Sequence, residues 1–268
     1  MTTRMNEYKQ QIITDFNSRT NYDNEFRHRF AKPLIELAQL KPGQRVLDVA
    51  TGTGIVAIAA AKIVGDAGYV LGVDISTGML AQARHKVELE KLQNIELIEA
   101  DADDLHFDDN SFDVIFCSAA IAYLTHVFSS LRQWYRFLNT SGIVAFSCFA
   151  ETAHTASILF REKAQQFGIT INNPNELLGT PEKCQALLQQ TGFQNIEVVT
   201  QQFGFYFKDA ETAWNAHANN VYGYQVYQLS PDKLAQLKAE YMAEIHALST
   251  EQGFGHDVNS LFVFARKS

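Results

Sequence analysis

A repeated unit of strand, short turn and helix constrains the fold of this chain more than any other feature of its sequence. Residues 45–49 predict a short strand, and the glycine-containing turn at residues 50–54 leads from it into an alanine-rich helix. Residues 69–74 predict a second strand, and Ser76 is a typical N-cap for a helix that ends near Leu92. Strands that alternate with helices are joined by right-handed crossovers, so they favour a mostly parallel sheet.

Five further segments bring the expected sheet to seven strands. They lie at residues 95–99, 112–118, 143–149, 196–202 and 260–265. We therefore predict an α/β fold with a Rossmann-like, doubly wound, mostly parallel seven-stranded sheet, helices on both faces and a helical substrate cover. Ligands of such sheets bind at the carboxyl ends of the strands, beside the point at which the strand order reverses.

The 268 residues suit a single domain with three parts. Residues 1–40 predict an N-terminal helical cover, residues 41–150 form the ligand-binding core, and residues 151–268 complete the sheet and add the substrate cover. Apolar spacing after Phe26 predicts an amphipathic helix in the first part, and Pro33 indicates a kink or a fresh helix start within it.

Charge and hydropathy exclude several classes of function. The chain has 22 basic and 30 acidic residues, a formal net charge of -8 and no cluster of Lys or Arg, so phosphate backbones would repel it and nucleic acid is not expected as a partner. No apolar run approaches the roughly 18 residues that a membrane span needs. The first residues lack the apolar core of a secretory signal, so we expect a cytoplasmic location.

Cysteine and histidine usage argues against a metal site. Cys117, Cys148 and Cys184 are isolated, and the first two lie in apolar runs that are typical of core packing. The eight histidines are scattered without the spacing of metal ligands, so we predict no metal.

Three carboxylates stand at the ends of consecutive predicted strands. Asp48 closes the first strand before the turn in which Gly52 and Gly54 let a ligand approach the backbone. Asp74 closes the second strand, where a carboxylate can accept hydrogen bonds from both hydroxyls of a ribose. Asp101 follows the third strand and is placed to accept from an exocyclic amine. Together these residues predict a cleft for an adenine, a ribose and a cationic tail.

Four segments of the sequence carry a resemblance to a known family. They are VLDVATGTG (46–54), GVDISTGML (72–80), EADADDLHFDDNSFDVIFCSAA (99–120) and LNTSGIVAFSCF (138–149). In order and spacing they resemble class I S-adenosylmethionine-dependent methyltransferases, of the small-molecule group that includes the ubiquinone and menaquinone biosynthesis enzymes. The resemblance covers roughly residues 20 to 150 and implies that S-adenosyl-L-methionine is the cofactor.

The resemblance also implies a set of cofactor contacts. At the methionine end these are Asp48, the turn residues Ala50, Thr51, Gly52 and Gly54, the backbone of Ser118 or Ala119, and Tyr22 closing over them. At the nucleoside end they are Asp74 on the ribose hydroxyls, Ile75 and Met79 against the adenine, and Asp101 and Ala102 on the adenine edge.

The sequence departs from the family pattern in two places. Ala50 replaces the first glycine of the common Asp-x-Gly-x-Gly-x-Gly turn, and it permits approach of the cofactor if its φ is negative. After the fourth strand, many relatives carry a His-His pair where this chain has Ala122 and Tyr123. A catalytic role assigned through that pair does not transfer to this chain.

Two histidines are candidates for a catalytic base. His126 follows the fourth strand on the cleft side, and His154 opens the first helix of the cover, although either residue can instead serve in packing. The aromatic residues between Phe203 and Tyr227 suit either core packing or an acceptor pocket. Four acidic residues after the third strand are expected in a solvated loop: Asp103, Asp104, Asp108 and Asp109. Of these, only Asp103 has a chance to contact adenine.

We predict an enzyme that transfers a methyl group from S-adenosylmethionine to an O, N or activated C atom of a small, apolar or aromatic molecule. An NAD(P)-dependent oxidoreductase is one alternative, because residues 52–57 and Asp74 also fit a dinucleotide fingerprint. Asp48 argues against it, since a carboxylate there would repel a pyrophosphate. A non-catalytic protein that binds S-adenosylmethionine on the same fold is the other alternative.

Overall fold

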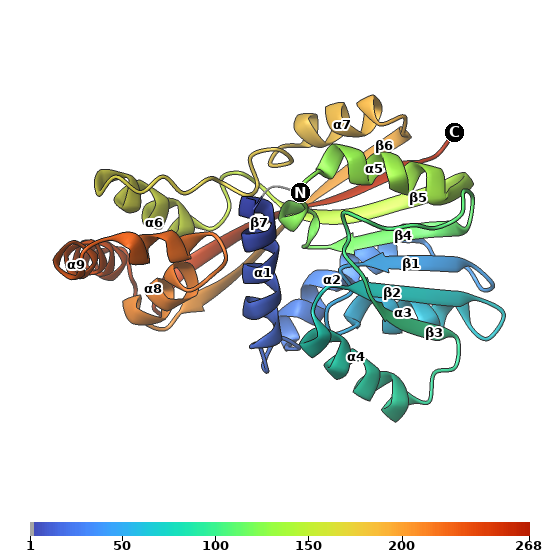
Figure 1. The fold of residues 1–268 in the computed structure, drawn as a ribbon, viewed down its shortest axis with the longest axis horizontal. Coiled ribbons are helices and arrows are strands. Elements are labelled where there is room, and N and C mark those ends of the chain that lie inside the picture. Colours follow the sequence, from blue (N-terminus) through green and yellow to red (C-terminus); the bar gives the residue numbers. More distant parts are fainter. Residues whose placement is uncertain (1–2) are drawn as a thin grey trace. The chain divides into compact units, whose positions relative to one another are not determined.

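Seven strands form one sheet in the computed structural model, which describes residues 3–268 (Figure 1). The strands are β1 (Arg45–Val49), β2 (Tyr69–Asp74), β3 (Ile95–Glu99), β4 (Phe112–Ser118), β5 (Leu138–Phe149), β6 (Gln194–Phe207) and β7 (Phe254–Arg266), in the order β3-β2-β1-β4-β5-β7-β6. β1 pairs in parallel with β2 and β4, β2 with β3, and β4 with β5. The predicted seven-stranded, mostly parallel sheet is confirmed, and the strand order reverses between β1 and β4.

Helices connect and cover these strands. They are α1 (Thr3–Asn17), α2 (Glu25–Ala38), α3 (Ile55–Val64), α4 (Thr77–Glu90), α5 (Val127–Phe137), α6 (Thr155–Gln166), α7 (Pro181–Gln190), α8 (Ala210–Ala218) and α9 (Pro231–Ala247), with the 3-10 turns η1 (Ile121–Tyr123) and η2 (Gly223–Gln228). In the part of the chain that the structure describes, no helix combines the length and the apolar character needed to cross a lipid bilayer.

The chain divides into two compact units whose segments interleave along the sequence. The first unit contains Met1–Cys148, Thr180–Val199 and Leu261–Ser268, and the second contains Phe149–Gly179 and Thr200–Ser260. Strands β6 and β7 each have residues in both units. The single-domain organisation expected from the sequence stays a prediction.

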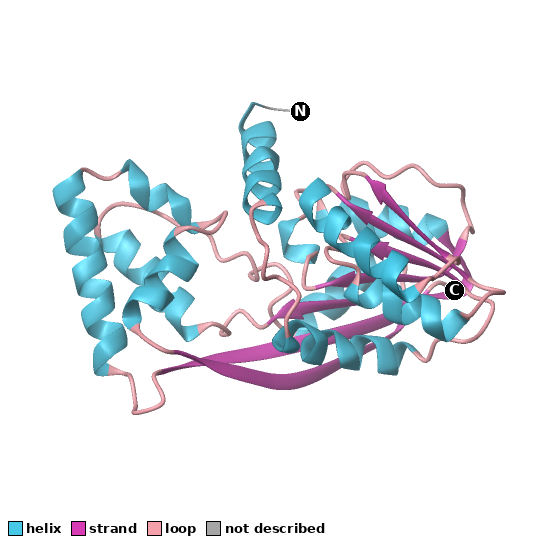
Figure 2. Ribbon diagram, turned by 90° about the horizontal axis from the view of Figure 1, so that it is seen from below, coloured by secondary structure: helices cyan, strands magenta, loops and turns pink. Residues whose placement is uncertain are grey.

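In the first unit, helices lie against the sheet (Figure 2), and the central parallel strands β1, β2 and β4 are mostly buried. Val46, Leu47 and Val70 are almost fully removed from solvent, as expected for strands at the centre of a parallel sheet. Ser76 is confirmed as an N-cap, since its side chain accepts a hydrogen bond from the Met79 N–H at 3.1 Å.

Helix α2 corrects one expectation from the sequence. No fresh helix starts at Pro33, because α2 runs unbroken from its N-cap Asn24 to Ala38. A proline inside a helix removes one backbone hydrogen bond. The buried side chains of Phe30 and Leu34, on either side of Pro33, hold the helix against the core in spite of that loss.

The second unit has its own core, built from α6, α8 and α9. Phe160, Trp214 and Tyr241 are buried together, and the Tyr241 hydroxyl donates a hydrogen bond to the carbonyl of Ala156 at 3.2 Å. Phe207 joins this core, while other aromatic residues of the same stretch remain exposed; these are Phe205, Tyr206, Tyr224 and Tyr227. Core packing therefore accounts for only part of the aromatic segment.

Candidate functional site

A pocket in the first unit lies at the carboxyl ends of the parallel strands and has a volume of about 1100 Å³, part of which is open solvent. Most of the predicted cofactor contacts line it: Tyr22, Asp48, Ala50, Thr51, Gly52, Asp74, Ile75, Asp101, Ala102 and Ser118. The strand-end rule therefore brought these residues together correctly in space, apart from Tyr22, which was expected from the family resemblance. Their contacts with the cofactor stay predictions.

Asp48 holds the turn after β1 and keeps one oxygen free of hydrogen bonds. Its Oδ2 accepts hydrogen bonds from the Thr51 hydroxyl at 2.6 Å and from the Ala57 N–H, in the first turn of α3, at 3.1 Å. Its Oδ1 is buried and has no hydrogen-bond partner among the residues that the structure describes. Burial raises the pKa of Asp48 to about 7. An unpartnered buried carboxylate oxygen fits a cationic ligand group such as the ammonium of S-adenosylmethionine.

Asp74 ties the end of β2 to the same turn. Its Oδ2 accepts from the Gly52 N–H at 2.7 Å, and its Oδ1 accepts from the Ser76 N–H at 2.8 Å. Burial raises the pKa of Asp74, although these backbone hydrogen bonds oppose the rise. A carboxylate has about four lone-pair sites and backbone N–H groups of Gly52, Ser76 and Ile75 occupy three of them, so Asp74 can still accept a ribose hydroxyl.

The backbone of the turn differs from the sequence expectation. Ala50 has a φ of 53°, in the left-handed region, so the condition of a negative φ is not met. The following glycines at positions 52 and 54 also have positive φ. The Thr51 N–H donates a hydrogen bond to the carbonyl of Val73, and this contact fixes the conformation of the turn. A glycine at position 50 would adopt that conformation with less strain than Ala50 does.

Two predicted contacts do not reach the pocket. A Cβ on Gly54 would lie 3.2 Å from the Cβ of Ala83, so Gly54 lets α3 approach α4. Met79 is fully buried on the inner side of α4 and is absent from the pocket lining. Ala119 lines the pocket, but its N–H is already engaged by Ser147, which leaves its carbonyl group for a ligand.

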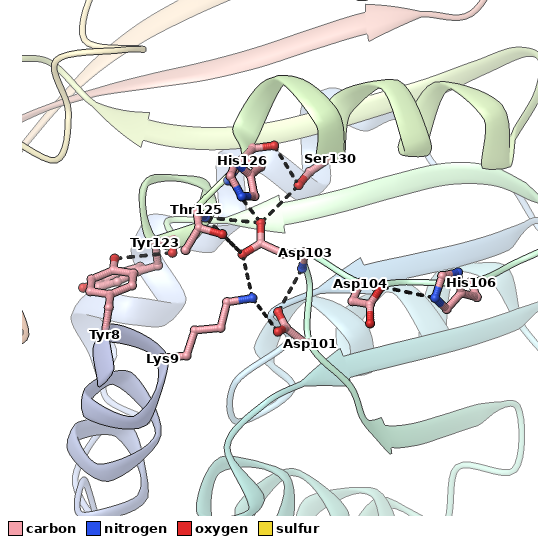
Figure 3. Close-up of polar contacts among 10 residues, drawn as sticks. All are labelled: Tyr8, Lys9, Asp101, Asp103, Asp104, His106, Tyr123, Thr125, His126 and Ser130. Carbon is pink, nitrogen blue, oxygen red and sulfur yellow. Dashed lines mark hydrogen bonds and ion pairs between the residues drawn. The ribbon is translucent and has the colours of Figure 1, made fainter. Parts of the chain in front are cut away.

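An ion cluster joins helix α1 to the loop after β3 (Figure 3). The Lys9 Nζ lies 2.5 Å from Asp101 Oδ2 and 3.0 Å from Asp103 Oδ2, and Lys9 is only 8% exposed. Burial opposes the charge on Lys9, but hydrogen bonds to the two carboxylates outweigh it and raise the Lys9 pKa. The N–H of Asp103 also donates to Asp101 Oδ1 at 3.0 Å.

The solvated-loop expectation is wrong for Asp103. Its side chain is 4% exposed, lines the pocket, and accepts hydrogen bonds from the hydroxyl and N–H of Thr125 and from the N–H of His126. Burial disfavours the ionised form, yet the bonds from Thr125 and Lys9 outweigh burial and lower the Asp103 pKa. The cause is the start of α5, whose free N–H groups draw the carboxylate inward. Asp104 does remain exposed, beside His106.

Aromatic and basic residues of α1, α2, the segment between them and η1 complete the pocket, and of these only Tyr22 was expected from the sequence. The Tyr22 Cε1 lies 3.9 Å from the position that a Cβ on Gly52 would occupy, and the Arg27 guanidinium lies 4.4 Å from the centroid of the Tyr22 ring. Phe16 meets Tyr123 edge-on at 5.5 Å between ring centroids. Burial raises the pKa of Tyr123 to about 12, so its phenol is neutral. None of these residues ends a strand, which is why the strand-end rule missed them.

The two histidines proposed as bases lie outside the pocket lining. His126 is exposed at the start of α5. His154 belongs to the second unit, where its ring stacks on His256 at 5.0 Å between centroids. Among the described residues, no group of three or more His, Cys, Asp or Glu side chains is arranged to hold a metal ion.

Comparison with known proteins gives matches to methyltransferases. Residues 46–142 match a family model described as a methyltransferase domain. The chain is 33% identical over 144 residues to aklanonic acid methyltransferase DauC of Streptomyces sp. strain C5, a match that covers 52% of this chain and 66% of the relative. It is 29% identical over 228 residues to demethylmenaquinone methyltransferase of Staphylococcus carnosus strain TM300, with 76% of this chain and 92% of the relative covered.

Among solved structures, the fold is similar to a SAM-dependent methyltransferase from Aquifex aeolicus. The TM-score is 0.57 at 17% sequence identity, and 98% of both chains is covered. At this sequence identity, the similarity to the solved structure concerns the fold alone.

The sheet order and the pocket at the strand ends define the Rossmann-like fold of class I methyltransferases. The family match then makes the identification closer: the chain carries a methyltransferase domain of the S-adenosylmethionine-dependent family, and its cofactor is S-adenosyl-L-methionine. The chain spans about two thirds of the first curated relative and most of the second. These matches favour the methyltransferase interpretation over the nicotinamide one.

Proposed function

We propose that this protein transfers a methyl group from S-adenosylmethionine to an oxygen, nitrogen or activated carbon atom of a small, apolar or aromatic molecule. The observation that carries the proposal is the buried, unpartnered Oδ1 of Asp48 in a pocket that also presents Asp74 and Asp101. The relatives support the class of acceptor, since their names specify aklanonic acid and demethylmenaquinone.

When bound, S-adenosylmethionine supplies an electrophilic methyl group on a sulfonium centre. At the methionine end, Asp48 attracts the ammonium group and Arg27 the carboxylate, while Tyr22 covers the glycine turn. At the nucleoside end, Asp74 accepts from the ribose hydroxyls, and Asp101 and Ala102 bind the adenine edge. These assignments are proposals that rest on the shared lining of one pocket.

The acceptor end of the pocket is formed by apolar and aromatic side chains. We assign this end to Ile12, Phe16, Phe30 and Leu124, which line the pocket, because apolar walls that keep water out would strengthen the electrostatic interactions within it. Aromatic faces favour a cationic sulfonium, and Tyr123 adds a neutral phenol that can donate a hydrogen bond to an acceptor molecule. Alignment of the acceptor with the methyl group supplies much of the rate in a displacement of this kind.

The general base stays open in this proposal. An amine attacks without one, whereas a phenol or alcohol benefits from proton removal. His126 and His154 remain the candidates that the sequence offers. We also retain the sequence predictions of a cytoplasmic location and of a small-molecule partner rather than nucleic acid.

The test is calorimetric titration with S-adenosylmethionine, S-adenosylhomocysteine, NAD and NADP, followed by turnover with labelled S-adenosylmethionine on phenols, quinols and amines. We expect the first two ligands to bind, and Asp74→Asn to weaken them by about tenfold or more. Asp104→Asn, a change of an exposed carboxylate, is the matched control and should bind normally.

Three other results would be decisive. Binding of a dinucleotide alone would make the protein an oxidoreductase. Binding of S-adenosylmethionine without turnover of any acceptor would favour the non-catalytic alternative. Equal weakening by Asp74→Asn and Asp104→Asn would remove the assigned nucleoside site.

A further inference from the structure

A recess in the second unit brings an arginine and a histidine to one surface. It contains about 260 Å³ of empty space between α6, the start of η2 and the segment after α6. Its lining includes Ser157, Arg161, His217, Asn220, Tyr222 and Gly223. No acidic side chain lines it.

Arg161 is a half-buried cation in this recess. Its Nη1 donates to the Ser157 hydroxyl at 2.9 Å, and the structure records no salt bridge to it from any residue between 3 and 268. Burial lowers the Arg161 pKa, and the charge of Glu162, its exposed neighbour in sequence, opposes this only in part. A guanidinium that loses water without gaining a carboxylate is costly, so a negatively charged ligand would stabilise it.

His217 adds a second unsatisfied group. It is 8% exposed, and its Nε2 is buried with no hydrogen-bond partner among the described residues. Burial lowers the His217 pKa to about 3, and the nearby positive charges of His154 and Arg161 lower it further. The imidazole is therefore neutral, and its Nε2 can carry a proton to donate to an acceptor.

The wall of the recess is held rigidly. The Asn220 side-chain oxygen accepts from the N–H groups of Tyr222 and Gly223, both at 2.9 Å. A Cβ on Gly223 would lie 1.8 Å from the carbonyl oxygen of His217, so only glycine allows this approach of η2 to α8. The positions of the lining groups follow from these contacts and do not require a ligand.

We propose that this recess binds a small oxyanion, either a carboxylate or a phosphate group, on Arg161, Ser157 and His217. An oxyanion supplies the negative charge that the guanidinium lacks, and it has enough lone pairs to accept from the Ser157 hydroxyl and the His217 Nε2–H together. A neutral ligand would satisfy the hydrogen bonds and leave the arginine uncompensated. This site is separate from the residues assigned to methyl transfer and does not rest on that proposal.

The test is a titration of the full chain with sodium phosphate and with sodium acetate, at constant ionic strength, followed by side-chain nitrogen NMR of histidine. His217→Gln assigns the His217 signal. We expect a saturable shift of that signal in the wild type, and about tenfold weaker binding in Arg161→Gln. Arg132→Gln, a change of an exposed arginine on α5, is the matched control and should bind like the wild type.

The two arms identify the ligand chemistry. Saturation by phosphate alone assigns a phosphate group, and saturation by acetate alone assigns a carboxylate. The absence of a saturable shift with both anions, or an equal affinity in Arg161→Gln and the wild type, overturns the proposal. Circular dichroism checks the fold of each variant, and Arg161→Lys and Ser157→Ala replace Arg161→Gln if it does not fold.

Discussion

The Nζ of Lys9 on α1 lies 2.5 Å from the Oδ2 of Asp101 at the end of β3, and this ion pair fastens the N-terminal helix to the edge of the cofactor pocket. Asp103 shares the same ammonium group. Asp101, which is proposed to bind the adenine edge, therefore also holds α1 in place.

Lys9→Met is expected to destabilise the protein by about 1–3 kcal/mol, because it leaves two carboxylates without their counter-charge. Hydrogen exchange of the α1 amides should accelerate more than that of the sheet, and the unfolding free energy is measured by urea titration. Lys62→Met is the control, since Lys62 pairs with Glu90 at the surface, where such a pair contributes about 0–1 kcal/mol. Equal losses in the two variants would show that the Lys9 pair is no more than a surface contact.

The buried carboxyl of Asp48 makes stability depend on pH. Its folded pKa of about 7 lies above the unfolded value, so the native state binds more protons and the unfolding free energy falls as the pH rises from about 4 to 7. Asp48→Asn should remove this part of the pH dependence. The unfolding free energy of the variant relative to that of the wild type should therefore increase by on the order of 3 kcal/mol between pH 5 and pH 8. Denaturant titrations at both pH values test it, and an identical difference between the two proteins at each pH would contradict it.

The same group predicts that binding of S-adenosylmethionine releases a proton near neutral pH. A cation beside Asp48 favours its ionised form, so the folded pKa falls on binding and affinity rises as the pH passes through 7. Calorimetry in two buffers of different ionisation enthalpy measures the released protons. Asp48→Asn should release fewer protons on binding. If this variant releases as many protons as the wild type, the released proton comes from a group other than Asp48.

Strain at Ala50 predicts a stabilising substitution. Ala50→Gly should raise the unfolding free energy by about 0.5–1 kcal/mol, because relief of the left-handed strain exceeds the added entropy of a glycine in the unfolded chain. Ala60→Gly, in the middle of α3, is the opposite control and should cost about 1 kcal/mol. The two are compared by guanidinium unfolding, and a loss at position 50 as large as at position 60 would contradict the strain argument.

Strand patterns were the most predictable part of the molecule. The predicted bounds of the first four strands agree with β1, β2, β3 and β4, because each of them is a short run rich in apolar and β-branched residues. β5 begins earlier than expected, at Leu138, since the pairing of Leu138 with Phe112 extends it across an irregularity in register. Such pairing depends on the neighbouring strand and leaves no local pattern.

The candidate site was predictable along the strand ends and, through the family resemblance, at Tyr22. Asp48, Asp74 and Asp101 were found there, but Lys9 and Arg27 were not, because their place in the pocket depends on how two helices pack rather than on spacing within them. The charge of Lys9 is the one signal available in the sequence, since a buried lysine needs acidic partners. Without the fold, nothing connects it to residue 101.

Arg27 provides the sharpest test of the methionine end of the pocket. It lines the pocket with its guanidinium above the Tyr22 ring, beside the glycine turn, and we propose that it binds the cofactor carboxylate. Arg27→Gln should weaken S-adenosylhomocysteine by about tenfold, the value of one charged hydrogen bond, and raise the KM for S-adenosylmethionine more than it lowers kcat. Adenosine lacks the amino acid, so its affinity should not change in the same variant.

Arg29→Gln, on the exposed side of α2, is the matched control and should leave the affinity for both ligands unchanged. If Arg27→Gln weakens adenosine as much as S-adenosylhomocysteine, the arginine supports the pocket as a whole and does not contact the carboxylate.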